Sequence, residues 1–130
     1  MQAYDDGTHE IINAVGNIHQ KFYLRSALKY VQILPLLESP AVEYFNFTDE
    51  ELAVMCASHD SEPIHLKTVR DILTKIGLDE TDLKCGPHTP MNICCAFDYI
   101  RNGVTPSFES GIYNNCSGKH AGFLAYCKWS

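Results

Sequence analysis

The segment from Glu62 to Gly77 is the part of the sequence that most constrains the fold. Pro63 stands in the first turn of a predicted helix, where the missing proline amide has no partner to lose. Apolar residues then recur with helical spacing at Leu66, Val69, Ile72, Leu73 and Ile76. Gly77 occupies the position at which a helix commonly ends. Because such a helix must bury its apolar stripe against other elements, the sequence predicts a packed globular core.

Further helices are predicted on both sides of this one. Thr48 and Glu51 form a capping box, in which each side chain can bond the backbone amide of the other, so a helix should follow over residues 49–57. Residues 79–83 are predicted to form a short helical turn, and residues 85–90 a loop. Helical spacing also predicts a helix from Ser26 that Pro35 ends or kinks, one over residues 91–101, and a last one from residue 119 or 120 towards residue 129.

Strand patterns are few. Residues 10–15 are predicted to form a short strand that ends at a turn, residues 21–24 a second strand, and the polar residues 1–10 are expected to be poorly ordered. With 130 residues, of which 45% are hydrophobic and 20% charged, the chain has the size and composition of one globular domain. We therefore expect a mostly helical chain that is a single domain over residues 1–130 or the N-terminal portion of a longer one.

Charge and cysteine usage exclude several classes of protein. The formal net charge is −6 and Lys and Arg are not clustered, which argues against nucleic acid as a partner. No apolar run is long enough to span a bilayer, and no secretory signal precedes the first helix. The six cysteines contain no CxxC pair, so they are interpreted as reduced and mostly buried thiols. We expect a cytoplasmic protein that contacts neither membrane nor nucleic acid.

Ser26 and Lys29 are the first candidates for chemistry. Their separation of three residues places both side chains on one face of a helix. A serine hydroxyl becomes a good nucleophile when a base takes its proton, and a lysine can be that base where its pKa is lowered by burial or nearby positive charge. On spacing alone, a capping serine and a surface lysine are the commoner explanation.

The second candidate segment joins two predicted helices over residues 56–65. Ser58 could provide another hydroxyl in a site, and His59 an acid, a base or an orienting group. The alternative is structural, because Ser61 or Glu62 could cap the following helix while His59 and His65 lie on the surface.

The third candidate segment covers residues 114–122. Polar turn residues here lead into a helix N-terminus, whose free amides can hold an anion or a developing oxyanion. Gly118 permits close backbone approach, and Cys116 and Lys119, three residues apart, can face the same point. Tyr113 and His120 replace residues that a nucleotide-binding loop needs, which argues against such a loop.

Six segments together resemble the asparaginase II family of amidohydrolases. They occur in the family order and with near-family spacing between about Ile11 and Trp129. The segments are RSALK, LPLLES, TDEELAVMCASH, EPIH, CGPH and NNCSGKHAG. The last of these and CASH followed by EPxH are specific, whereas SxxK is specific only in their company.

The resemblance implies a fold, a reaction and a site. The fold would be α/β, with a mixed sheet and flanking helices as in serine β-lactamases and glutaminases. The reaction would be hydrolysis of L-asparagine to L-aspartate and ammonia, with Ser26 as nucleophile, Lys29 as its base and Ser58 as proton relay or oxyanion donor. Substrate-binding roles would fall to Arg25, His59, Glu62 and Gly118. Cys116 and Lys119 would bind zinc, and a homodimer is left open.

Two departures from the family keep other functions open. Family chains are longer, so that a second lysine partner and another cysteine ligand would lie beyond Ser130. Asp60 and Ser61 replace a small Ser-Gly-like pair, which adds a carboxylate beside the site. The alternatives are a glutaminase or penicillin-recognising Ser–Lys enzyme, and a catalytically incomplete fragment that binds metal, amino acid or a partner chain.

Overall fold

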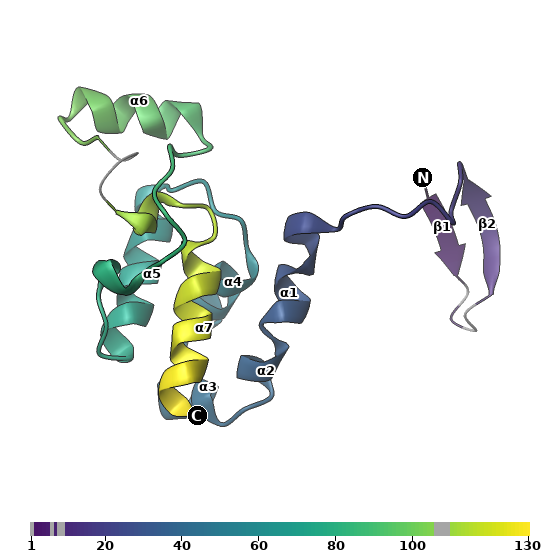
Figure 1. The fold of residues 1–130 in the computed structure, drawn as a ribbon, viewed down its shortest axis with the longest axis horizontal. Helices are drawn as coiled ribbons and strands as arrows, with labels where there is room; N and C mark the ends of the chain where they lie inside the picture. Colours follow the sequence, from purple (N-terminus) through teal and green to yellow (C-terminus); the bar gives the residue numbers. More distant parts are fainter. Residues whose placement is uncertain (1, 6, 8–9, 106–109) are drawn as a thin grey trace.

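The computed structural model describes residues 2–5, 7, 10–105 and 110–130, and most of its regular structure is helical (Figure 1). The N-terminal part contains β1 (Gln2–Asp5), β2 (Ile11–Val15), the 3-10 turn η1 (Arg25–Leu28), α1 (Lys29–Gln32), α2 (Leu34–Leu37) and α3 (Ala41–Tyr44). The rest contains α4 (Asp49–Cys56), α5 (Pro63–Lys75), η2 (Glu80–Asp82), α6 (Ile93–Arg101), η3 (Gly111–Tyr113) and α7 (Ser117–Trp129).

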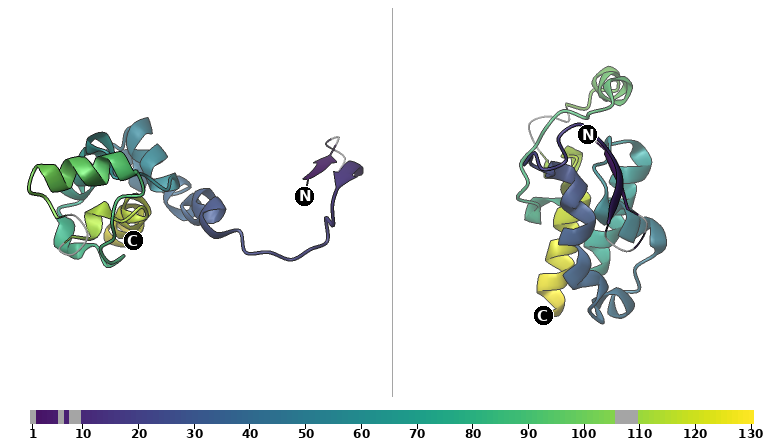
Figure 2. Two further views of the ribbon diagram at one scale, coloured as in Figure 1. Left: turned by 90° about the horizontal axis from the view of Figure 1, so that it is seen from above. Right: turned by 90° about the vertical axis from the view of Figure 1, so that its right-hand side faces the viewer.

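The core forms where α7 packs against α4, α5 and α2 (Figures 1 and 2). The apolar stripe predicted on α5 is buried as expected, with Val69 and Ile72 fully inaccessible. Met55 of α4 and the small residues Ala121 and Ala125 of α7 complete this interior. The predicted capping chemistry is therefore combined with burial of one continuous apolar face, which stabilises short helices that would not persist alone.

Two glycines allow α7 to approach its neighbours closely. A Cβ atom on Gly118 would lie 2.4 Å from the carbonyl oxygen of Val54 in α4. A Cβ atom on Gly122, one turn later, would lie 2.5 Å from Cδ1 of Ile33. A side chain at Gly118 would push α7 away from α4, because the Val54 backbone cannot yield cheaply, whereas a side chain at Gly122 would force the Ile33 side chain to move.

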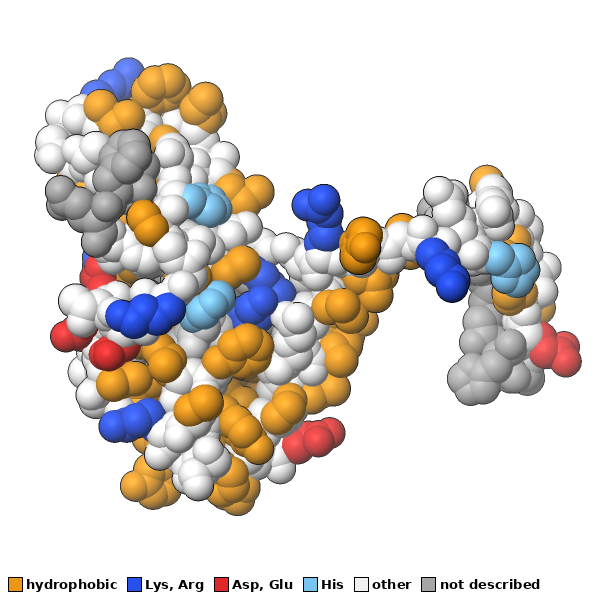
Figure 3. Space-filling view, viewed as in Figure 1, with side chains coloured by type: hydrophobic (Ala, Val, Ile, Leu, Met, Phe, Trp, Pro, Cys, Tyr) orange, Lys and Arg blue, Asp and Glu red, His pale blue; other side chains and the backbone are white. Residues whose placement is uncertain are grey.

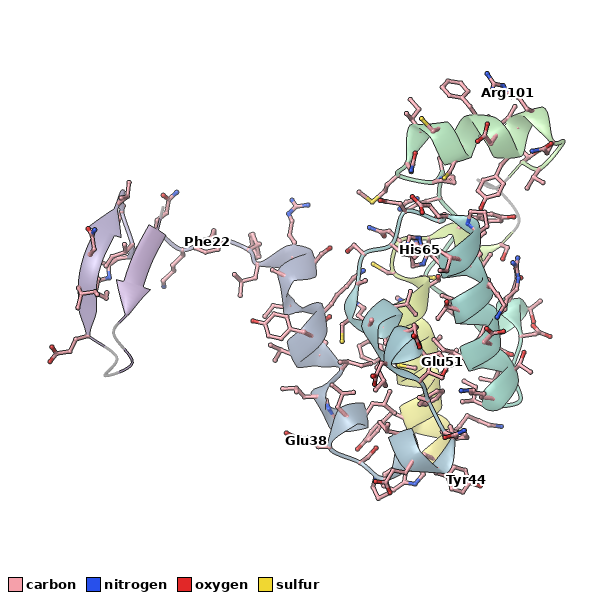
Figure 4. All side chains as sticks on the ribbon, turned by 180° about the vertical axis from the view of Figure 1, so that it is seen from behind. Phe22, Glu38, Tyr44, Glu51, His65 and Arg101 are labelled. Carbon is pink, nitrogen blue, oxygen red and sulfur yellow. The ribbon has the colours of Figure 1, made fainter. Side chains whose placement is uncertain are left out.

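The capping box predicted before α4 is present. Thr48 Oγ1 accepts from the amide of Glu51, and the Thr48 amide donates to Glu51 Oε2 over 2.7 Å. The same carboxylate oxygen accepts from Lys75 Nζ at 2.7 Å, so the buried Glu51 also joins the start of α4 to the end of α5 (Figure 4).

Strands were predicted less well than helices. β2 and the turn after it are confirmed, but β1 is formed by residues for which the sequence predicts poor order, and residues 21–24 form no strand. Of residues 1–10, residues 1, 6, 8 and 9 lie outside the described part. β1 pairs antiparallel with β2. This pairing is made by hydrogen bonds between backbone groups, so it can form without an alternating apolar pattern in the sequence. The hairpin projects from the helical body on the connecting residues 16–24 (Figures 1 and 2).

The helix predicted from Ser26 is divided into η1, α1 and α2, and it breaks at Ile33 just before Pro35, which lies in the first turn of α2. Two other helix starts differ from the prediction, and one of them is that of α6, which begins at Ile93 rather than at residue 91. The last helix begins two or three residues earlier than predicted, at Ser117. The expected mixed sheet is not seen, because β1 and β2 make up the sheet of the described residues. Within the same residues, each helix is too short or too polar to cross a membrane.

Candidate functional site

The buried amine of Lys29 is the centre of the candidate site. The Lys29 side chain reaches inward from the start of α1 and is only 2% exposed. Its Nζ donates to the carbonyl oxygen of Ala57 at 2.8 Å and to that of Asn115 at 3.0 Å. Three segments that are distant in sequence therefore meet at one nitrogen.

Ser26 lies at the surface on η1, one turn before Lys29. Its backbone carbonyl accepts from the Lys29 amide, but within the described residues its hydroxyl makes no hydrogen bond to the lysine amine. The preceding residue, Arg25, is also exposed and has a positive φ of 48°, which is unusual for a residue with a side chain. The exposed Ser26 hydroxyl is thus accessible to a substrate.

The connection between α4 and α5 holds Ser58 and His59 in contrasting environments. Ser58 is exposed, whereas His59 is 2% exposed and has both ring nitrogens bonded. The Ser61 amide donates to Nδ1 over 3.1 Å, so the ring proton belongs on Nε2, which lies 2.7 Å from Ser117 Oγ. Burial, helped by the neighbouring His65 and Lys29, lowers the pKa of His59 to about 4. His59 is therefore a neutral, interior histidine.

The turn before α7 is bound to the CGPH loop by Asn114. Asn114 Nδ2 donates to the carbonyls of Cys85 and Gly86, both at 2.9 Å, while its Oδ1 accepts from the amide of Cys116 at 2.8 Å. Burial raises the pKa of the Cys85 thiol, and the charge of the neighbouring Cys116 adds to this effect. The two half-buried thiols thus lie near each other and near Lys29.

The residues predicted to bind zinc make an incomplete donor set. Cys116 lies at the N-cap of α7, whereas Lys119 Nζ donates to Gln32 Oε1 at 3.2 Å and lies 5.7 Å from the centre of the Phe123 ring. The described residues contain no group of three His, Cys, Asp or Glu side chains that could hold a metal. Because zinc takes three or four protein ligands, these two do not by themselves fit it.

Glu62 and Gly118 have structural contacts. Glu62 Oε1 accepts from Asn92 Nδ2 at 3.2 Å, and the Asn92 side chain also caps α6. Glu62 is the N-cap of α5, but neither it nor Ser61 makes the side-chain cap that the structural alternative predicts. Gly118 is buried and its close approach is to Val54 of α4.

Sequence reasoning missed four residues that organise the site, namely Ser61, Tyr99, Asn114 and Ser117. Two of them, Asn114 and Ser117, stand inside the NNCSGKHAG segment, and their polar side chains at a helix start could have indicated them. Ser61 and Tyr99 gave no such indication, because their contacts depend on the backbone conformation of Ser61 and on the position of α6.

Comparison with known proteins identifies the family. The family model described as L-asparaginase II matches residues 3–130. Among curated proteins, no match to this chain was found. The match includes the segments that carry Ser26 and Lys29, Ser58, and Cys116. These three segments meet at the Lys29 amine, which bonds the carbonyls just before Ser58 and Cys116. The chain belongs to the L-asparaginase II family.

Proposed function

We propose that this chain is an asparaginase-type amidohydrolase that converts L-asparagine and water to L-aspartate and ammonia. Its family supports the amide-hydrolysing class. The observation that carries the proposal is the Lys29 amine, which donates to the carbonyls of Ala57 and Asn115. These carbonyls directly precede Ser58 and Cys116, so one buried amine lies against the backbone of both specific family segments.

In the first half of the reaction, Ser26 Oγ attacks the side-chain amide carbon of the substrate and its proton passes to Lys29 Nζ. The amine must be neutral for this step, with two hydrogens and one lone pair. The two hydrogens can stay on the carbonyls of Ala57 and Asn115, which leaves the lone pair to accept the proton. When the carbon–nitrogen bond breaks, Lys29 returns this proton to the departing ammonia.

In the second half, water hydrolyses the ester formed between Ser26 and the aspartyl group. Lys29 takes a proton from the attacking water, and that proton returns to Ser26 Oγ as L-aspartate leaves. We assign the exposed hydroxyl of Ser58 to proton relay or to hydrogen bonding with the oxyanion, because Ser58 directly follows the carbonyl that holds Lys29.

Substrate binding is assigned to the groups around this centre. Arg25 is exposed and directly precedes the nucleophile in the chain, and its guanidinium suits a carboxylate of the amino-acid substrate. We also keep Glu62 and the backbone near Gly118 as predicted contacts of the substrate. A zinc ion on Cys116 and Lys119 would need further donors than these two, and no step above uses it.

The remaining expectations are proposals of the same kind. The six cysteines are free thiols, which fits a reducing compartment, and we therefore place the protein in the cytoplasm. We also keep two further proposals, namely a mixed sheet like that of β-lactamase-like enzymes in the whole fold and assembly as a homodimer.

The test is ammonia release from L-asparagine by the purified chain. We expect turnover that Ser26→Ala abolishes and that Ser130→Ala, an exposed serine on the far end of α7, leaves unchanged. Equal activity in Ser26→Ala and wild type would remove Ser26 from the mechanism. Assays with L-glutamine and with a penicillin, read as ammonia and as a covalent adduct, distinguish the related Ser–Lys enzymes.

A non-catalytic binding role is the second candidate, and one observation favours it. Among the described residues, the Ser26 hydroxyl is not bonded to the Lys29 amine, whose recorded acceptors are both backbone carbonyls. This candidate predicts that L-asparagine or zinc binds in calorimetry without turnover. Ammonia release that depends on Ser26 would contradict it.

A further inference from the structure

The connection between α4 and α5 is held in place by its odd-numbered residues. The carbonyl of Ala57 accepts from Lys29 Nζ, and the amide of His59 donates to the carbonyl of Asn115 at 3.2 Å. Both bonds reach across to segments far away in sequence. Residues 57–59 are consequently fastened to α1 and to the turn before α7.

Ser61 is fastened even more completely. It is fully buried and has a φ of 61°, a left-handed conformation that a residue with a side chain seldom adopts. Its amide donates to His59 Nδ1, its hydroxyl donates to the Tyr113 carbonyl at 2.6 Å, and its carbonyl accepts from the Tyr99 hydroxyl at 2.6 Å. These three bonds hold the backbone in a conformation that it would otherwise leave.

The even-numbered residues of the same connection point elsewhere. Ser58 is exposed and Asp60 is half-buried, and neither side chain makes a hydrogen bond within the described residues. Ser58 stands between Ala57 and His59, whose backbone groups are both held by hydrogen bonds to distant segments. Fixing these two neighbours therefore fixes the backbone position from which the Ser58 hydroxyl is presented.

The His59 side chain connects the α4–α5 connection with the start of α7 through its two ring nitrogens. Nδ1 accepts from the Ser61 amide, and Nε2 donates to Ser117 Oγ, which donates in turn to the Ile112 carbonyl at 2.9 Å. Ser117 is fully buried, so its hydroxyl has no water to replace a lost partner. Each nitrogen and hydroxyl group in this series of hydrogen bonds therefore has a defined role as donor or acceptor.

We propose that His59 and Ser117 are positioning residues, whose hydrogen bond holds residues 57–61 so that Ser58 is presented beside the Lys29 amine. This inference rests on the proposed amidohydrolase function for its catalytic part. His59 then acts through the backbone and makes no contact with substrate, which replaces the substrate-binding role expected from the sequence. The partner that makes this possible, Ser117, has no role in the family expectation given above.

The first test is amide hydrogen exchange in the chain of residues 1–130. Two amides report on the arrangement directly, since the His59 amide donates to Asn115 and the Ser61 amide to His59 Nδ1. We expect Ser117→Ala to speed exchange at both by about tenfold or more relative to α5 core amides. The matched control is Ser39→Ala, because the Ser39 hydroxyl likewise makes two hydrogen bonds, in its case both to backbone groups, but lies between α2 and α3. Unchanged exchange in Ser117→Ala would overturn the proposal.

The second test separates positioning from binding by steady-state kinetics on L-asparagine. We expect Ser117→Ala and His59→Ala to lower kcat about tenfold with KM within about twofold, because the substrate contacts remain. His59→Gln, which can still donate to Ser117, should recover part of kcat. A rise in KM at constant kcat would instead assign His59 to substrate binding and contradict the proposal.

The two tests fail separately. A wild-type chain without turnover contradicts the proposed function and, with it, the catalytic part of this inference. Unchanged exchange at the His59 and Ser61 amides contradicts the positioning role even in a fully active enzyme. Faster exchange in Ser117→Ala combined with wild-type kcat would show that the held conformation is irrelevant to catalysis, and would overturn it as well.

Discussion

At the scale of single residues, the neutral state of His59 links stability to pH. Its pKa is about 4 in the folded chain, against 6.5 for an unperturbed histidine, because burial disfavours the charged ring. As the pH falls from 6.5 to 4, the unfolded chain binds a proton at His59 that the folded chain does not. We expect this residue to remove about 2 to 3 kcal/mol of unfolding free energy over that range.

Urea unfolding of wild type and His59→Gln between pH 7 and 4 measures this contribution. All other side chains are the same in both proteins, so the difference between the two curves isolates His59. The wild-type advantage should be largest above pH 6.5 and should shrink towards pH 4. Parallel curves would show that His59 titrates alike in the folded and unfolded chains.

Ser61 offers a second prediction at this scale. Its left-handed backbone costs about 1 kcal/mol for a residue with a side chain, and its hydroxyl bond to Tyr113 offsets part of this cost. Ser61→Ala keeps the strain and loses the bond, so we expect about 1 to 2 kcal/mol of destabilisation. Ser61→Gly loses the bond but relieves the strain and should stay within about 0.5 kcal/mol of wild type. Chemical denaturation measures both, and equal losses would contradict the assigned strain.

At the scale of elements, the contact between α4 and α7 depends on the absence of a side chain at Gly118. In an open helix, replacing glycine by alanine stabilises by about 1 kcal/mol. Here the added Cβ would meet the Val54 carbonyl at 2.4 Å, and backbone cannot give way cheaply. We therefore expect Gly118→Ala to destabilise by about 2 kcal/mol or more, as overpacked cores do.

The matched control is Gly77→Ala, at a position with a φ of 69° but with open space around it. It should cost only the left-handed strain of about 1 kcal/mol. Urea denaturation measures the unfolding free energy of both variants, so the loss caused by steric overlap in Gly118→Ala can be compared with the loss caused by backbone strain in Gly77→Ala. A Gly118→Ala variant as stable as wild type would mean that α7 lies further from α4 than the structure shows.

The success of sequence reasoning differed among elements for physical reasons. α5 could be predicted because the residues that determine it lie within its own segment: Pro63 marks its start, the apolar spacing its buried face, and Gly77 its end. β1 could not, because strand pairing is made by backbone groups whose partners lie elsewhere in the chain. In the site, the three candidate segments around Lys29, Ser58 and Cys116 meet at the Lys29 amine, although their catalytic roles stay predictions. The interior position of His59 could not be predicted, since it depends on Ser117, 58 residues away.

At the scale of the whole molecule, apolar surface is unevenly covered. Hydrophobic side chains gather on the surface over α2 and α7 (Figure 3). Gln32, Ile33, Leu36, Phe123 and Tyr126 line a cavity of about 310 Å³ there, together with Pro35 and Cys127. The projecting hairpin is likewise uncovered, with Ile12 and Val15 of β2 more than half exposed. The stability of the body therefore comes from the helices around α7, and the hairpin adds little to it.

Removal of the hairpin tests this division. We expect a chain that lacks residues 1–16 to keep the helical signal of the full chain, with a midpoint of thermal unfolding within about 2 °C of it. The reason is that β1 and β2 pair with each other, while the side chains of β2 are exposed along its whole length. Far-UV circular dichroism against temperature measures both quantities. Leu73→Ala in α5 is the control for sensitivity, because truncating this buried side chain should cost about 2 to 5 kcal/mol and lower the midpoint by roughly 8 °C or more. A comparable fall after removal of the hairpin would show that β1 and β2 pack on the helical body in solution, and that the apolar residues of β2 belong to its core.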